Sequence, residues 1–74
     1  MKKSSVEWDK IQDLMNYMEL LTGYQQKVVD NWFRNLDPNE PFLNQQSEKQ
    51  WKWLNFLHAK VVEGNEEKAR GYYD

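Results

Sequence analysis

The 74-residue chain contains four tryptophans, four tyrosines and three phenylalanines, but no cysteine and only one histidine. Its length is that of one small domain, residues 1–74. Without cysteine it can form neither a disulfide nor a thiolate zinc site. Ten Lys and Arg residues oppose twelve Asp and Glu residues, and no segment concentrates either sign. This balance argues against a dedicated nucleic-acid binder, whose affinity rests on phosphate neutralisation, and against an acidic mimic of nucleic acid.

The first predicted helix covers residues 6–21, where apolar side chains recur at helical spacing and polar side chains fill the opposite face. Ser4 and Glu7, three positions apart, match the capping box that opens many helices. Leu20 falls on the polar face and is an exception to the pattern.

A second helix is expected to begin near Gly23, where Thr22 and Gln25 form another capping-box pattern. It should end at Asp37-Pro38, because the residue before a proline is disfavoured in the helical conformation. Its predicted apolar face consists of Val28, Val29, Trp32, Phe33 and Leu36.

Residues 37–46 contain two prolines and are predicted to form a loop, anchored by Phe42 and Leu43. A third helix then follows Ser47, which has Gln50 three positions on and matches the capping box again.

This third helix is predicted to run to about Glu63, with Gly64 suited to the cap after it. A short fourth helix is expected near residues 65–70, followed by a Tyr72-Tyr73 tail. No segment shows the alternation of a strand. Three amphipathic helices with short connections predict an all-α fold, a small three-helix bundle.

The chain offers little material for catalysis. His58 is the only imidazole and lies in the middle of the apolar face of the third helix, which is typical of a histidine at the core edge that hydrogen-bonds a neighbour. The carboxylate pairs Asp9/Asp13 and Glu66/Glu67 lie on faces expected to be solvated. No glycine-rich phosphate loop is present. We therefore predict a protein that is not an enzyme and that uses no metal or cofactor.

Residues 29–35, Val-Asp-Asn-Trp-Phe-Arg-Asn, resemble the recognition helix of homeodomains, with its V-x-x-W-F-x-N pattern. The resemblance implies that Trp32 and Phe33 are core residues and that Asn35 reads adenine. The stretch from Gly23 through Trp32 is also loosely similar to a bacterial helix-turn-helix, with Gly23 in the turn.

The pattern departs from homeodomains directly after the asparagine. Homeodomains continue with basic residues, whereas here Leu36-Asp37-Pro38 ends the helix, and Asp30 lies on the face that would meet phosphate. Nucleic acid is therefore a disfavoured partner, and a DNA-binding regulator is kept as an alternative function. Its reading residues would be Lys27, Asn31, Arg34 and Asn35.

Aromatic residues on the third helix indicate a binding face. On a helical wheel Phe56 falls between Lys52 and Lys60 on the polar side, beside Trp53. Tryptophan is enriched at binding hot spots, and a basic rim around an aromatic centre suits an acidic, apolar partner. The loop over residues 37–46 or the tyrosine tail could instead fold over these rings. The predicted partner-binding residues are Trp53, Phe56, Lys49, Lys52 and Lys60.

These features predict a small protein-binding adaptor or inhibitor that acts through the aromatic face of the third helix. Its size and near-neutral charge are typical of phage or mobile-element products that act on host proteins. A self-assembling subunit, with a homodimer interface over the rings, is a further alternative. No unbroken apolar run exceeds two residues and none resembles a signal peptide, which predicts a cytoplasmic protein without a membrane segment.

Overall fold

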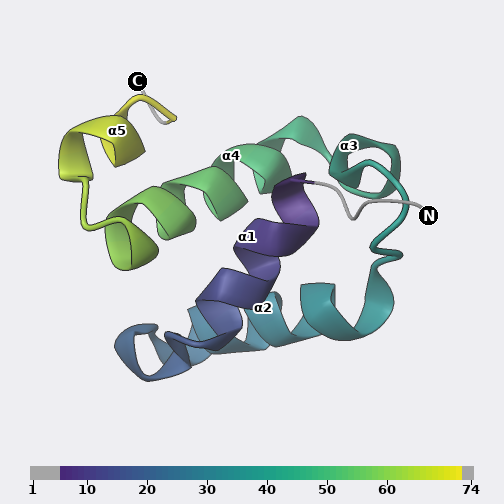
Figure 1. Cartoon of the computed structure of the whole chain (residues 1–74), viewed down its shortest axis with the longest axis horizontal. Coiled ribbons are helices and arrows are strands. Elements are labelled where there is room, and N and C mark those ends of the chain that lie inside the picture. The colour runs from purple at the N-terminus through teal and green to yellow at the C-terminus, as the bar shows by residue number, and fades with distance from the viewer. Residues whose placement is uncertain (1–5, 73–74) are drawn as a thin grey trace.

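The computed structural model describes residues 6–72, and every regular element within them is helical, which confirms the predicted all-α class (Figure 1). The predicted cap at Ser4 and the end of the tail at Tyr73 lie outside these residues. The elements in chain order are α1 (Val6–Met15), the 3₁₀-helix η1 (Met18–Leu20), α2 (Gly23–Asn35), α3 (Phe42–Gln45), α4 (Glu48–Leu57), the π-helix η2 (His58–Val62) and α5 (Glu66–Arg70).

The hydrophobic core lies where α1, α2 and α4 meet. Figure 1 shows α1 crossing the space between α4 and α2, and α1 packs against both helices. α5 lies at the far end of α4, against α4 and η2. The buried core side chains are Ile11, Leu14, Leu21, Val29, Trp32, Phe42, Leu54 and Leu57.

The first helix is shorter than predicted. α1 ends at Met15 rather than near Leu21, because the backbone tightens there: Tyr17 N donates to Leu14 O, three residues back, at 2.9 Å. Such bonds belong to the 3₁₀-helix and end the α-helical ladder. The turn through η1 buries Leu21 and leaves Leu20 exposed, as its position on the polar face predicts.

The second helix begins and ends where the sequence predicts. Gln25 N donates to Thr22 Oγ1 at 3.2 Å, and Thr22 N donates to Gln25 Oε1 at 3.0 Å, which completes the capping box. α2 ends at Asn35, and Leu36 is extended ahead of Pro38.

The predicted apolar face of α2 is wrong at one position. Val29 and Trp32 are buried, but Phe33 is 39% exposed and is not a core residue. Its ring stacks on Trp8 of α1, with centroids 5.4 Å apart and an interplanar angle of 12°. Phe33 therefore lies at the edge of the α1–α2 contact.

The predicted loop contains the single-turn helix α3. Phe42 is buried and meets Trp32 edge-to-face, with ring centroids 5.7 Å apart. Leu43 is 54% exposed, so the loop has one anchor and not the predicted two. The side chain of Gln45 holds the loop start, because its Oε1 accepts from Asp37 N at 2.8 Å and its Nε2 donates to Asp37 O at 3.0 Å.

The predicted third helix consists of α4 and η2. Ser47 Oγ accepts a hydrogen bond from Gln50 N at 3.3 Å and caps α4. At η2 the helix widens, so that Glu63 N donates to His58 O, five residues back, at 3.1 Å. Gly64 then takes a φ of +63° and ends the helix, as predicted. α5 confirms the short fourth helix.

Candidate functional site

The five predicted partner-binding residues share one face of the α4–η2 helix. Their spacing of i, i+3, i+4, i+7 and i+11 follows a single helical stripe. α4 packs against α1, α3 and α5, and its buried residues Leu54 and Leu57 belong to the core. We call this set the α4 stripe; it consists of Lys49, Lys52, Trp53, Phe56 and Lys60.

The helical wheel predicts that Trp53 projects freely from the stripe. In the structure Trp53 is instead half-buried between two rings of α2. It meets buried Trp32 edge-to-face, with centroids 5.9 Å apart, and Tyr24 stacks on it, with centroids 5.6 Å apart. Tyr24 itself is 70% exposed. Together with Lys49 and Gln50, the Tyr24 and Trp53 rings line a surface hollow.

Tyr24 is the site residue that sequence reasoning missed. It occupies the first turn of α2, directly after Gly23. Nothing in its local pattern indicates a contact with Trp53, 29 positions away in the chain. The only available signal is an aromatic residue among the polar side chains of that turn.

Phe56 is also half-buried and packs against the core, which corrects the prediction of an outward ring. α5 packs against α4 next to this ring. Lys60 Nζ lies 5.6 Å from the centroid of the Phe56 ring. A hollow of about 170 Å³ lies between α4, η2 and α5, lined by Phe56, Lys60, Glu66, Ala69 and Arg70.

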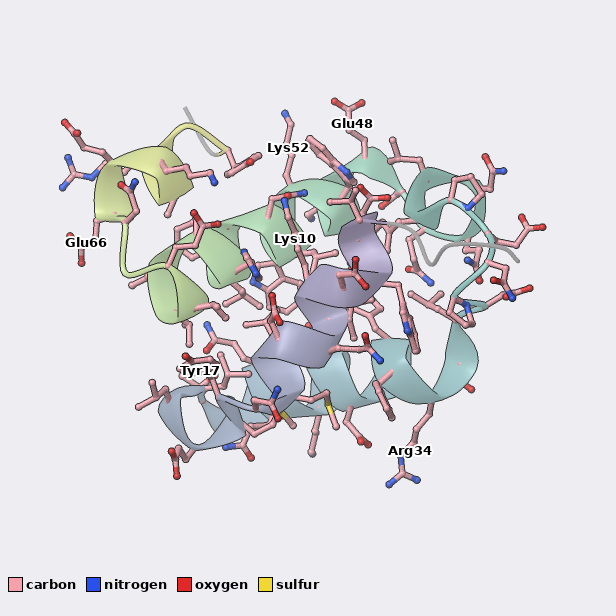
Figure 2. The ribbon with its side chains drawn as sticks, in the orientation of Figure 1. Lys10, Tyr17, Arg34, Glu48, Lys52 and Glu66 are labelled. Carbon is pink, nitrogen blue, oxygen red and sulfur yellow. The ribbon has the colours of Figure 1, made fainter. Side chains whose placement is uncertain are left out.

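The loop over residues 37–46 and the tail residue Tyr72 pack on rings that lie outside the α4 stripe. The loop residue Phe42 packs on Trp32, and Tyr72 meets Trp51 edge-to-face with centroids 5.9 Å apart. Tyr72 also lines a third hollow, together with Glu48, Lys49 and Lys52 of α4. Figure 2 shows Lys52 and Glu48 extending outward from α4.

A polar network around the buried side chain of His58 lies on the opposite side of α4. His58 Nε2 is 2.9 Å from Asp13 Oδ2 of α1, and His58 Nδ1 is 3.0 Å from Glu63 Oε2. The imidazolium form can donate to both carboxylates, whereas a neutral ring can donate from one nitrogen only. This arrangement confirms the interpretation of His58 as a hydrogen-bonded residue at the core edge. The π-turn of η2 brings Glu63 back to His58.

The network continues from Glu63 into α5. Lys68 Nζ donates to Glu63 Oε1 at 2.8 Å. This hydrogen bond, followed by the contact with His58, lowers the pKa of Glu63 from its ordinary value. The same bond raises the pKa of Lys68. α1, η2 and α5 are thereby joined by charged side chains at one end of the molecule.

Lys10 forms a second polar contact between α1 and α4. Its Nζ donates to Oδ1 of buried Asn55, and Asn55 Nδ2 donates to Trp51 O at 2.8 Å. Burial lowers the pKa of Lys10, and the nearby positive charge of Lys68 lowers it further. In the described part of the chain, each buried side-chain nitrogen or oxygen has a hydrogen-bond partner.

The candidate DNA-reading residues share the exposed face of α2, and three of them, Asn31, Arg34 and Asn35, bond within that helix. Arg34 Nε lies 3.0 Å from Asp30 Oδ2, and Figure 2 shows Arg34 pointing away from the body of the molecule. Asn35 Nδ2 donates to Asn31 Oδ1 at 2.6 Å. Lys27 is exposed on the same face. The Asp30 carboxylate therefore lies among the cations that would have to meet phosphate.

Residues 6–72 contain no group of three or more His, Cys, Asp and Glu side chains arranged to hold a metal ion. Over the same residues, none of the helices combines the length and the apolar character needed to cross a bilayer. No protein-family model matches the chain, and no curated protein or solved structure gives a significant match to it.

Proposed function

We propose that this protein is a non-enzymatic adaptor or inhibitor that binds an acidic, apolar segment of another protein through the α4 stripe and Tyr24. One observation carries the proposal. Two half-buried rings, Trp53 and Phe56, share a single helix face with three exposed lysines, beside a tyrosine ring that is 70% exposed. A cytoplasmic location and an origin in a phage or mobile element belong to the same proposal.

The aromatic side chains would supply affinity. Tyr24 already rests on Trp53, so its ring is ordered before a partner arrives. Covering such a ring gains roughly 2–4 kcal/mol at about 25 cal/mol per Å² of apolar surface. Tyrosine and tryptophan dominate binding hot spots for this reason.

The lysines would supply selectivity for acidic partners. Lys49, Lys52 and Lys60 follow the stripe, and Glu48 is the carboxylate of α4 that lines a hollow with two of them. The chain as a whole carries a net charge of −2, so this local positive field stands out from the rest of the surface. Charges at the rim of an interface mainly raise association rates and exclude like-charged partners.

A displayed library of randomised helical peptides tests the proposal. We expect selection on the wild-type protein to enrich acidic peptides with apolar anchors. The Lys49→Glu, Lys52→Glu double variant should lose their binding, and Tyr24→Ala should weaken it by about 10-fold or more, a loss of about 1.4 kcal/mol. The matched control is Lys27→Glu, Arg34→Glu, which makes the same charge change on α2 and should bind like wild type.

Two outcomes would contradict the proposal. One is the enrichment of peptides that bind equally well to the Lys49→Glu, Lys52→Glu variant. The other is a concentration-dependent dimer in sedimentation experiments that Tyr24→Ala disrupts, because the stripe would then be a contact between copies of this chain.

A further inference from the structure

We infer that the hollow between Phe56 and α5 is an anchor pocket for one apolar side chain of the partner, next to a partner carboxylate. This inference rests on the proposed function and adds a specificity determinant to it. It places a second contact point on the stripe, apart from the Tyr24–Trp53 hollow.

The size and lining of the hollow suit one side chain. Its volume is about 170 Å³, and a protein cavity of roughly 150 Å³ holds a benzene ring. Ala69, which is 1% exposed, and the half-buried ring of Phe56 are its apolar lining residues. An apolar side chain in this position would gain contacts on several sides.

The α5 wall is held in place before any partner binds. Asn65 Oδ1 accepts from Lys68 N at 3.0 Å and caps the helix. Lys68 also bonds Glu63 at 2.8 Å, and Tyr72 packs on Trp51 beyond the end of α5. Since these contacts use side chains that do not line the hollow, the lining residues would require little reorganisation on binding.

The charges around the hollow favour a carboxylate next to the anchor. Lys60 and Arg70 line it from η2 and α5, against one carboxylate, Glu66. Lys60 already lies over the face of Phe56. A partner side chain that enters the hollow would therefore be flanked by two cations.

The two hollows also define a spacing for the partner. Trp53 and Lys60 are seven positions apart, which corresponds to roughly 10 Å along a helix. A bound helix with apolar residues at i and i+7 would present one to each hollow from the same face. Acidic residues between these anchors would lie near the stripe lysines.

Disulfide tethering tests the pocket without a known partner, because the chain has no native cysteine. The Glu66→Cys variant is equilibrated with three disulfide probes in the presence of a small free thiol, and the probes carry a phenyl group and a carboxylate, the phenyl group alone, or the carboxylate alone. The matched control is Glu19→Cys, the same substitution on η1. Mass spectrometry measures the labelled fraction under thiol exchange.

We expect the phenyl-carboxylate probe to label the Glu66→Cys variant about 10-fold more than the Glu19→Cys variant, an advantage of about 1.4 kcal/mol. When Lys60→Gln and Arg70→Gln are added to the Glu66→Cys variant, the phenyl-carboxylate probe should label no better than the phenyl probe. When Phe56→Ser is added instead, the phenyl-carboxylate probe should label no better than the carboxylate probe. Equal labelling of the two cysteine variants would overturn the pocket. Peptide binding that depends on Lys49 and Lys52, without tethering at the hollow, would support the proposed function and contradict the pocket. Tethering at the hollow without peptide binding would support the pocket and contradict the proposed function.

Discussion

His58 Nε2 lies 2.9 Å from Asp13 Oδ2, although the two residues are 45 positions apart in the chain. The contact joins α1 to the point where α4 widens into η2. The other ring nitrogen of His58 faces Glu63, so one buried imidazole holds two carboxylates from different elements. The helix that carries the α4 stripe is therefore held on its opposite side by polar contacts as well as by the apolar core.

Replacement of His58 should destabilise the protein. We expect His58→Leu, which keeps a similar volume but removes both contacts, to lower the free energy of unfolding by about 1–3 kcal/mol. Urea denaturation followed by tryptophan fluorescence measures the change. The control is Arg34→Ala, which breaks an exposed i,i+4 pair and should cost less than about 0.5 kcal/mol. Equal losses in the two variants would contradict the importance of the His58 contacts.

The lowered pKa of Glu63 predicts a pH-dependent contribution to stability. Its hydrogen bond from Lys68 favours the ionised carboxylate, so the contribution is complete above the ordinary value of 4.5 and is lost as the pH falls through the lowered native value. Glu63→Gln should therefore be less stable than wild type at about pH 7 but equal to it near pH 2.

Urea denaturation at several pH values measures this difference, with Glu19→Gln as the matched removal of one carboxylate from η1. A gap between Glu63→Gln and wild type that stays constant down to the lowest pH would show that ionisation of Glu63 does not stabilise the fold.

The neighbours Phe42 and Leu43 should respond very differently to truncation. Phe42→Ala removes a buried ring that packs on Trp32 and should cost about 3–5 kcal/mol. Leu43→Ala changes a side chain that is 54% exposed and should cost less than about 1 kcal/mol. Thermal unfolding monitored by circular dichroism compares them. Similar losses would mean that both residues anchor the loop.

The two glycines at helix boundaries provide a backbone test. Gly64 has a φ of +63°, and a Cβ there would meet nothing within 4 Å, so Gly64→Ala should cost only the conformational penalty, about 1–2 kcal/mol. Gly23 begins α2 without a positive φ, and Gly23→Ala should be neutral or stabilising by up to about 1 kcal/mol. A larger loss for Gly23→Ala than for Gly64→Ala would contradict the backbone argument.

Local chemistry in the sequence was sufficient to predict the bounds of α2, the start of α4 and the end of η2, but it did not predict α3. The Thr22–Gln25 capping box begins α2, Pro38 limits its end, and Gly64 ends η2. Each of these signals acts through hydrogen bonds or backbone conformation within a few residues. The α1 boundary was missed because the periodicity continues through η1 while the backbone bonds change from four to three residues back.

The sequence by itself determined the all-α class, the positions of most helices and the single stripe that holds Lys49, Lys52, Trp53, Phe56 and Lys60. Only the tertiary structure decided that Tyr24 stacks on Trp53, that Phe56 and α5 line a common hollow and that His58 meets Asp13. The physical reason is that helical periodicity sets the direction of a side chain around its own axis. What it contacts depends on how the other helices pack, and that is settled by burial of the whole core.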